Sequence, residues 1–518
     1  MSGADCPRGV MERARTLSIE LKEDLLRPLS GVATKLSWRN VDLPLGLIFF
    51  VSVVLRMTNL AYSHFQGDEI KALFPENAVF PDFLLNQRKG PGQFVVTLGV
   101  RLATGGYEEW ITRLPFALSS VASVLVIFYL TREHWGRSPA LLAAALVGTC
   151  GLLVAFGRIV QYQSFCILFV VLTAYMMLKA LRSDSLKLIY IGFFFYALAL
   201  LMHYDALVFA PTLCLLAAAY CWRQRNQPLR SIAHLVCAAS ISLSIAAAFY
   251  LPYTQRSKFL EVRSYLMERL TDGRGTGTFN DTYTLLGLYF PPYYLLFIVL
   301  FLLLGITLLL RNRRDIFSFA LILWFVTAFV FYMFLGGDPR SHVYNYFVPG
   351  LIITAYGIHE IIAFAASFPV RRLLMTSVWL VVLAFACSVY YMLVDHRVEH
   401  PWYSKTILGK PLPNLEDRHI DGVFGFPYRR GLEMVGALFD SGQLRGTFDS
   451  NERAAMADYY FHSRRGSVPD YYIYVYRPLS LERELPAFVT ERYRRIREIS
   501  VRGRKTIDIY AISVPAHK

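Results

Sequence analysis

The sequence predicts a polytopic α-helical membrane protein that ends in a small α/β domain. Of its 518 residues, 55% are hydrophobic and 38 are phenylalanines, which is too apolar for an ordinary soluble enzyme. Many apolar runs reach the roughly 20 residues that a membrane-spanning helix needs. From Asp395 onward the composition changes to that of a soluble domain. These observations together predict the fold class.

The apolar runs predict about 11 transmembrane helices. Residues 1–42 precede the first run as a cytoplasmic segment, and the membrane body covers 43–394. Two long loops, 63–112 and 252–291, interrupt the series. Within the first loop, Phe94–Ala103 is short for a crossing and predicts a helix at the membrane interface. The expected spans lie near residues 43–62, 114–130, 139–156, 164–181, 188–202, 206–221, 231–251, 292–310, 316–335, 343–365 and 373–394.

The basic residues gather in alternate loops between the apolar runs, which places the N-terminus in the cytoplasm by the positive-inside rule. An odd number of crossings then places the C-terminal domain and both long loops outside the cell membrane. The same clustering accounts for the net charge of +15, so nucleic acid is not an expected partner. None of the seven cysteines shows metal-ligand spacing.

The hydrophilic region 395–518 predicts a small extracytoplasmic α/β domain. Residues 471–477 and 506–514 alternate in the manner of strands. The region shows no nucleophile motif, so we expect it to support or recognise rather than catalyse. Helical patterns cover residues 429–440, 450–463 and 481–493.

The second long loop predicts an amphipathic helix near Ser257–Leu270, followed by alternating glycines over residues 272–277. Such a segment suits a lid or a hinge. An ordinary exposed loop tip is an equally good interpretation.

Two charged pairs in the first long loop are the first candidates for chemistry. Asp68 and Glu69 follow the first span, and Arg88 and Lys89 follow about twenty residues later. A carboxylate there suits a general base, and the cations suit a phosphate clamp at the membrane rim. As structural alternatives, the carboxylates could open a helix, and the cations could be solvated or anchor the interface.

Further polar residues fall at the same predicted outer ends of the spans and are candidate substrate contacts. Taken singly, an arginine here more often anchors a span end, a histidine more often packs at an interface, and a tyrosine fits the aromatic belt. Their shared side of the membrane predicts one outward-facing site. They are Arg158, Gln161, Gln163, His203, Asp205, Arg340, His342 and Tyr344.

Transfer of a sugar from a lipid phosphate would need this set of groups. The lipid tail holds the donor phosphate at headgroup level, and the phosphate that leaves must be met by Lys or Arg. The acceptor hydroxyl needs a carboxylate that takes its proton as it attacks.

The sequence resembles the GT-C integral-membrane glycosyltransferases, of the protein O-mannosyltransferase and lipid A aminoarabinose transferase type. The resemblance rests on Gly67-Asp68-Glu69, on the Lys-Pro-Pro-like segment Arg88–Gly92, and on Arg113-Leu114-Pro115 before a span. It covers about residues 45–200 at motif level. It implies a GT-C-like fold, Asp68 as general base, and Lys89 as a ligand of the lipid phosphate.

The resemblance also implies further phosphate contacts at Arg340 and Tyr344, with Arg88 supporting Lys89. Many relatives carry a second acid where this chain has Gln161-Tyr162-Gln163, so Asp205 or Glu69 would have to substitute. The family's Lys-Pro-Pro is altered here to Lys-Gly-Pro.

We therefore expect an inverting glycosyltransferase, with Asp68 and Glu69 as its catalytic candidates. It would move a sugar from a polyprenyl-phosphate donor to a hydroxyl of a glycan, lipid or protein on the outer membrane face. The alternatives are a transporter or flippase of lipid-linked sugars and a non-catalytic membrane scaffold. No cofactor is required and no metal site is predicted, although Asp68 and Glu69 with Asp205 leave a divalent cation open.

Overall fold

The computed structural model describes residues 42–272, 276–291, 293–313, 315–335, 340–365, 368–407, 409–415, 423–480 and 484–513. The predicted N-terminal segment lies outside the described residues except for its last residue, and so do residues 273–275 of the glycine segment. Residues 48–518 form one compact unit, which is described below. The predicted division at residue 395 stays a prediction.

Each predicted apolar run contains a helix. Within the described residues, eight helices are long and apolar enough to cross a membrane, and a pair bent by 63° gives up to nine. Two further apolar helices are shorter, α3 (Leu43–Met57) and α11 (Leu186–Met202). The helical membrane body is therefore confirmed, whereas a count of 11 crossings stays a prediction.

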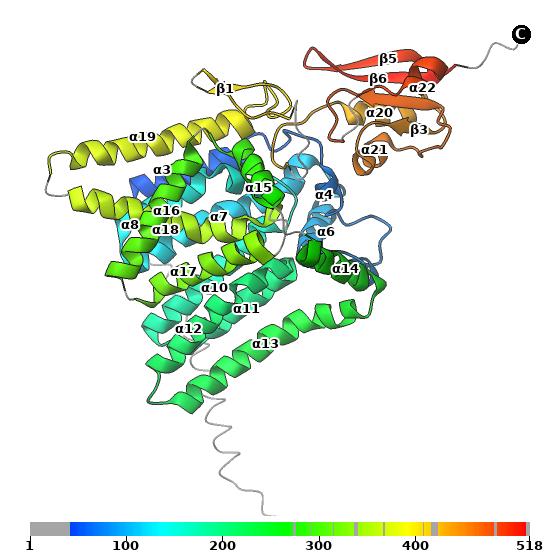
Figure 1. Ribbon diagram of the computed structural model, residues 1–518. Helices are drawn as coiled ribbons and strands as arrows, with labels where there is room; N and C mark the ends of the chain where they lie inside the picture. Colours follow the sequence, from blue (N-terminus) through cyan, green and yellow to red (C-terminus); the bar gives the residue numbers. More distant parts are fainter. Residues whose placement is uncertain are drawn as a thin grey trace, which may run out of the picture. The chain divides into compact units, whose positions relative to one another are not determined.

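The long helices are labelled in Figure 1, and several of them join consecutive elements. The bent pair is α8 (Arg137–Thr149) with α9 (Gly151–Gly157). The eight long ones are α7 (Glu109–Trp135), α10 (Gln163–Ser183), η2 with α12 (Tyr204–Arg223), α13 (Pro228–Thr254), α16 (Tyr294–Asn312), α17 with η3 (Ile316–Leu335), α18 (Tyr344–Phe364) and α19 with η6 (Arg371–Val394).

Small residues let the helices at the centre of the body approach closely. A Cβ on Gly305 of α16 would lie 2.3 Å from the carbonyl oxygen of Ile353, and a Cβ on Gly357 of α18 would lie 2.4 Å from that of Phe301. Only glycine fits at such spacing, as is common where helices meet in membranes. Helices α10 and α11 also pack against each other, and so do α7 and α8 (Figure 1).

Short helices fill the two long loops. The first loop holds α4 (Gly67–Ile70), α5 (Phe80–Leu85) and α6 (Gly92–Thr104), and α6 matches the helix expected there. The second holds α14 (Ser257–Asp272), as expected, and α15 (Thr276–Tyr289), which was not expected.

The C-terminal region contains a four-stranded sheet in the order β3-β4-β6-β5, coloured orange to red in Figure 1. Strand β3 (Phe448–Ser450) is parallel to β4 (Tyr471–Val475), and β6 (Arg504–Ile512) is antiparallel to both β4 and β5 (Tyr493–Val501). The expected strands β4 and β6 are confirmed. A small hairpin of β1 (Thr406–Ile407) and β2 (Lys410–Pro411) precedes the sheet.

Of the three expected helices, α20 (Leu432–Asp440) and α21 (Ala454–Phe461) are confirmed. The prediction of a helix over 481–493 is wrong in extent, because α22 covers only Ala487–Arg492 and strand β5 follows at once. Five consecutive exposed residues in β5 hide the alternation that would have revealed the strand.

Candidate active site

Asp68 lies in the first turn of α4, where the chain enters the first long loop. Gln66 and Glu69 close this turn as a capping box, in which the Glu69 carboxylate accepts the N–H of Gln66 at 3.0 Å. The structural alternative that the acidic pair opens a helix is thus confirmed. Asp68 itself stays half exposed, with its carboxylate 4.0 Å from the Lys71 ammonium.

Glu69 points away from solvent into an ion pair with Arg113, and both side chains are 0% exposed. Nε and Nη2 of Arg113 donate to the two carboxylate oxygens, each at 2.9 Å. The Val160 N–H also donates to the Glu69 carboxylate, at 3.0 Å. Sequence analysis grouped Glu69 with Asp68 as catalytic, but in the structure its carboxylate joins three segments of the chain.

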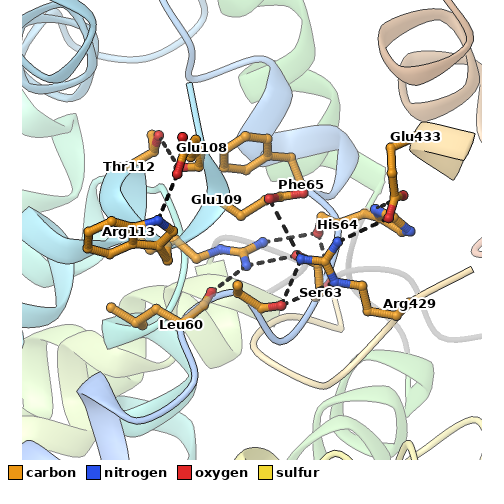
Figure 2. Close-up of polar contacts among 12 residues, drawn as sticks. Leu60, Ser63, His64, Phe65, Glu108, Glu109, Thr112, Arg113, Arg429 and Glu433 are labelled. Carbon is orange, nitrogen blue, oxygen red and sulfur yellow. Dashed lines mark hydrogen bonds and ion pairs between the residues drawn. The ribbon is translucent and has the colours of Figure 1, made fainter. Parts of the chain in front are cut away.

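Arg113 also holds the chain that leads to Asp68. Its Nη1 donates to the carbonyl oxygens of Leu60 at 2.8 Å and Ser63 at 2.9 Å, and its Nη2 to that of His64 at 3.0 Å (Figure 2). Every N–H of the guanidinium is therefore used. The arginine of the Arg-Leu-Pro motif fixes the first loop from α7.

Lys89 is held against the end of α11 by the glycines that follow it. A Cβ on Gly90 would lie 2.2 Å from the carbonyl oxygen of Leu201, and one on Gly92 would lie 2.5 Å from the sulfur of Met202. The Lys89 ammonium lies 5.3 Å from the centre of the Tyr162 ring. The altered Lys-Gly-Pro segment therefore permits closer packing than a residue with a Cβ at position 90 would allow.

The Lys89 ammonium interacts electrostatically with predicted site residues from two separate loops, Asp68 and Asp205. Burial lowers the pKa of the Lys89 ammonium below its usual value, and the carboxylates of Asp68 and Asp205 oppose this shift. The ammonium therefore lies within electrostatic reach of both carboxylates. Desolvation of this kind strengthens the attraction for an incoming anion.

His203, Asp205, His342 and Tyr344 form one buried cluster. The Asp205 carboxylate lies 3.0 Å from Nδ1 of His203 and 2.7 Å from Nδ1 of His342, and it accepts the Tyr344 hydroxyl at 2.9 Å. The His203 ring stacks on Tyr162 with 3.8 Å between centres. Burial lowers the pKa of His203, against the raising effect of Asp205. The structure thus brings together residues that the sequence placed in separate loops.

Three predicted arginines have different surroundings. Arg88 forms an ion pair with Glu261 of α14 at the surface. Arg158 is buried, and its Nη1 donates to the carbonyl oxygens of Leu55 at 3.0 Å and Thr58 at 2.9 Å, so it caps the end of α3. The backbone of Arg340 lies in a short 3-10 turn, and its side chain is outside the described part of the chain.

Gln161 and Gln163 are buried on either side of Tyr162. Nε2 of Gln163 donates to Oε1 of Gln161 at 2.8 Å. Among the described residues, Nε2 of Gln161 and Oε1 of Gln163 have no hydrogen-bond partner. One amide donor and one amide acceptor therefore have no partner next to Tyr162, whose ring contacts Lys89.

Comparison with known proteins shows what this fold resembles. The crystal structure of ArnT from Cupriavidus metallidurans bound to undecaprenyl phosphate matches with a TM-score of 0.56 and 13% identity, over 90% of this chain and 97% of ArnT. The apo form of ArnT matches with a TM-score of 0.53 and 12% identity, over the same shares of the two chains. The chain has the GT-C fold of membrane glycosyltransferases.

Sequence comparison agrees with the fold over parts of the GT-C body. Residues 91–250 match the family described as dolichyl-phosphate-mannose-protein mannosyltransferase. YkcB, a candidate mannosyltransferase of Bacillus subtilis (strain 168), is 28% identical over 89 residues. That alignment spans 17% of this chain and 12% of YkcB, so it covers a small part of either protein. The resemblance to GT-C enzymes is confirmed.

Contacts with the C-terminal region support the first long loop, and sequence reasoning missed them. Nε2 of His64 accepts the backbone N–H groups of Arg430 at 3.1 Å and Gly431 at 3.2 Å. Nδ1 of His64 lies 3.3 Å from the Glu433 carboxylate (Figure 2). The hydroxyl of Tyr460 lies 3.2 Å from the Glu109 carboxylate. More than 300 residues separate these partners (His64 and Arg430 are 366 apart), so no local pattern in the sequence could reveal them.

Tyr162 is the functional candidate that sequence analysis passed over. It lies between Lys89 and His203, with the ammonium over its ring and the imidazole stacked on it. Its position between two glutamines, where the resemblance implies an acid, was the available signal.

Proposed function

We propose that this protein is an inverting glycosyltransferase that moves a sugar from a polyprenyl-phosphate donor to an acceptor hydroxyl. The observation that carries the proposal is the partly buried Lys89 ammonium, which interacts electrostatically with the Asp68 carboxylate and lies 5.3 Å from the centre of the Tyr162 ring. The GT-C fold supports it, and so does the mannosyltransferase family match over residues 91–250. The ArnT structure that shares the fold holds undecaprenyl phosphate.

Asp68 is the general base of the proposed reaction. Its carboxylate is half exposed and lies 4.0 Å from the exposed Lys71 ammonium, so an acceptor hydroxyl can reach it. As the hydroxyl oxygen attacks the anomeric carbon, its proton passes to Asp68. The bond from the sugar to the phosphate breaks, and its electron pair leaves with the lipid phosphate. A base placed in this way contributes about 10²–10⁴-fold.

Lys89 receives the charge that develops on the leaving phosphate. A cation in a site of low dielectric stabilises that charge more than a solvated one does, and it is already in place before the reaction. A bound phosphate opposes the lowering of the Lys89 pKa by burial. The unused amide atoms of Gln161 and Gln163 suit hydroxyl groups of the sugar.

Glu69 and Arg113 act as positioning residues in this scheme, because their ion pair holds α4 against α7 and the turn at Val160. Arg88 is occupied by Glu261 and needs a rearrangement before it can assist Lys89. We place the site on the outer membrane face, with a cytoplasmic N-terminus, and expect a glycan, lipid or protein acceptor. Nothing in the comparisons supports the flippase alternative.

Two substitutions test the assigned roles in purified full-length protein. Asp68→Asn should lower transfer about 10²-fold or more, with donor binding retained. Lys89→Gln should weaken binding of a polyprenyl phosphate by about 10- to 100-fold, the worth of a hydrogen bond to a charged group. Exposed Glu76 provides the matched control as Glu76→Gln. Full transfer by Asp68→Asn would refute its role as base, and unchanged phosphate affinity in Lys89→Gln would refute the clamp.

A further inference from the structure

We propose that His203, Asp205 and His342 bind a divalent transition-metal ion, Zn²⁺ by ligand chemistry. Their ligand atoms all lie within 4.8 Å of one another, and these are the only such group of three found among the described residues. Asp205 and His342 come from loops 137 residues apart in the sequence. The proposed metal-binding cluster therefore forms only in the folded protein.

The His203 ring lies against the Asp205 carboxylate. Its Nδ1 lies 3.0 Å from Oδ1 of Asp205 and 3.2 Å from the backbone nitrogen of Asp205. Imidazole and carboxylate ligands bind a metal ion in their deprotonated forms, so the ion would take the place of a proton between these two groups.

Both imidazole rings are held in place by tyrosines. Tyr162 stacks on His203 with 8° between the ring planes, and Tyr332 stacks on His342 with 6° between them. The Tyr344 hydroxyl orients the carboxylate by donating to Oδ2 of Asp205 at 2.9 Å. Fixed rings and a hydrogen-bonded carboxylate are the outer support that metal sites require.

The distances suit zinc with little movement. Zinc binds imidazole nitrogen and carboxylate oxygen at about 2.0–2.2 Å, which places two ligands of a tetrahedral site about 3.4 Å apart. Here the two nitrogen–oxygen separations are 3.0 and 2.7 Å. The cluster would have to open by about half an ångström. Two imidazoles with one carboxylate favour zinc over magnesium, which prefers oxygen ligands.

An ion here would keep one open position. The His203 and Asp205 side chains are 2% and 1% exposed, whereas the His342 side chain is 13% exposed and provides the access. Three protein ligands with one free position are typical of catalytic zinc. Lys89 interacts electrostatically with both Asp205 and His203. If the proposed function holds, an ion held by these residues would share with Lys89 the charge of the leaving phosphate.

Metal analysis of the purified full-length protein tests the inference. Protein stripped with a chelator and reloaded with Zn²⁺ should retain one ion per chain after dialysis, and Asp205→Asn and His342→Gln should retain only background. His462→Gln is the matched control, because His462 forms a similar contact with Asp440, at 2.9 Å, on the surface. Elution by size-exclusion chromatography reports the folding of each variant.

Co²⁺ loaded in place of zinc gives a second readout that needs no variant. The wild-type protein should show the intense visible bands of tetrahedral Co²⁺, and these should disappear on addition of Zn²⁺. Zinc retention at background in the wild-type protein, or equal retention in Asp205→Asn, would mean a hydrogen-bonded cluster only and would overturn the inference. Sugar transfer by metal-free protein would leave the proposed function standing in that case. Zinc binding without any transfer would refute the function alone.

Discussion

Replacing Glu69 with glutamine tests whether the buried ion pair positions the active site. The change keeps the size of the side chain but removes the charge that faces Arg113, at a place where both partners are 0% exposed. Breaking a buried pair by removing one partner costs about 3–5 kcal/mol. Glutamine keeps one acceptor oxygen, so we expect the low end, about 3 kcal/mol of folding free energy. This corresponds to about a hundredfold in the folding equilibrium.

The effect on activity follows from the other bonds of Arg113. The same guanidinium holds the carbonyl oxygens of Leu60, Ser63 and His64, which precede Asp68 in the chain. Glu69→Gln weakens the hold of Arg113 on this segment and should therefore lower kcat for transfer. The affinity for polyprenyl phosphate, which depends on Lys89, should change little. Thermal unfolding in detergent measures the stability, and a transfer assay gives kcat and KM separately.

The control for this experiment is Glu76→Gln, an exposed carboxylate in the same loop. It should unfold at the temperature of the wild-type protein. If Glu69→Gln is as stable as this control, the ion pair does not hold the loop. If it is stable but inactive, Glu69 takes part in the chemistry and its assignment as a positioning residue is wrong.

Three further changes probe the surroundings of the site. Gly90→Ala should weaken phosphate binding by about tenfold, a loss of about 1.4 kcal/mol of binding free energy. The reason is that a Cβ at position 90 would lie 2.2 Å from the carbonyl oxygen of Leu201, so the segment with Lys89 must move. Unchanged phosphate affinity would contradict this. Burial and nearby arginines lower the pKa of His64 below 6.5, so its contribution to stability is present above about pH 6.5 and is lost as pH falls toward the folded pKa. The contribution of His64 to the slope should approach about 1.4 kcal/mol per pH unit, so the slope should be smaller by that amount in His64→Asn; thermal unfolding of both proteins between about pH 7.5 and 5.5 measures the difference. Gly357→Leu should destabilise the helical body by about 3 kcal/mol or prevent folding, because α16 leaves no room for a side chain; normal expression and melting would refute that packing.

Much of this architecture could be predicted because hydropathy and charge act locally. A run of apolar residues becomes a helix wherever the chain folds, so each predicted run contains one. The acids, histidines and tyrosine at the predicted outer ends could be placed on one side for the same reason. The 2.7 Å approach of His342 to Asp205 shows that two of these loops meet.

The individual roles of charged residues could not be predicted, because they depend on partners distant in sequence. Glu69 and Asp68 are neighbours with the same chemistry, yet Arg113, 44 residues away, binds one of them and leaves the other half exposed. Arg158 caps α3 across about a hundred residues of chain, a role that its local sequence does not indicate. Tyr162 gains its position only because the first long loop brings Lys89, and the end of α11 brings His203, to its ring.

A structure of the full-length protein with polyprenyl phosphate bound tests the central claim most directly. We expect the phosphate to contact the Lys89 ammonium beside Tyr162, with the Asp68 carboxylate facing it across a gap the size of one sugar. A phosphate bound away from Lys89, or an Asp68 carboxylate turned away from the phosphate, would contradict the assignment of base and clamp.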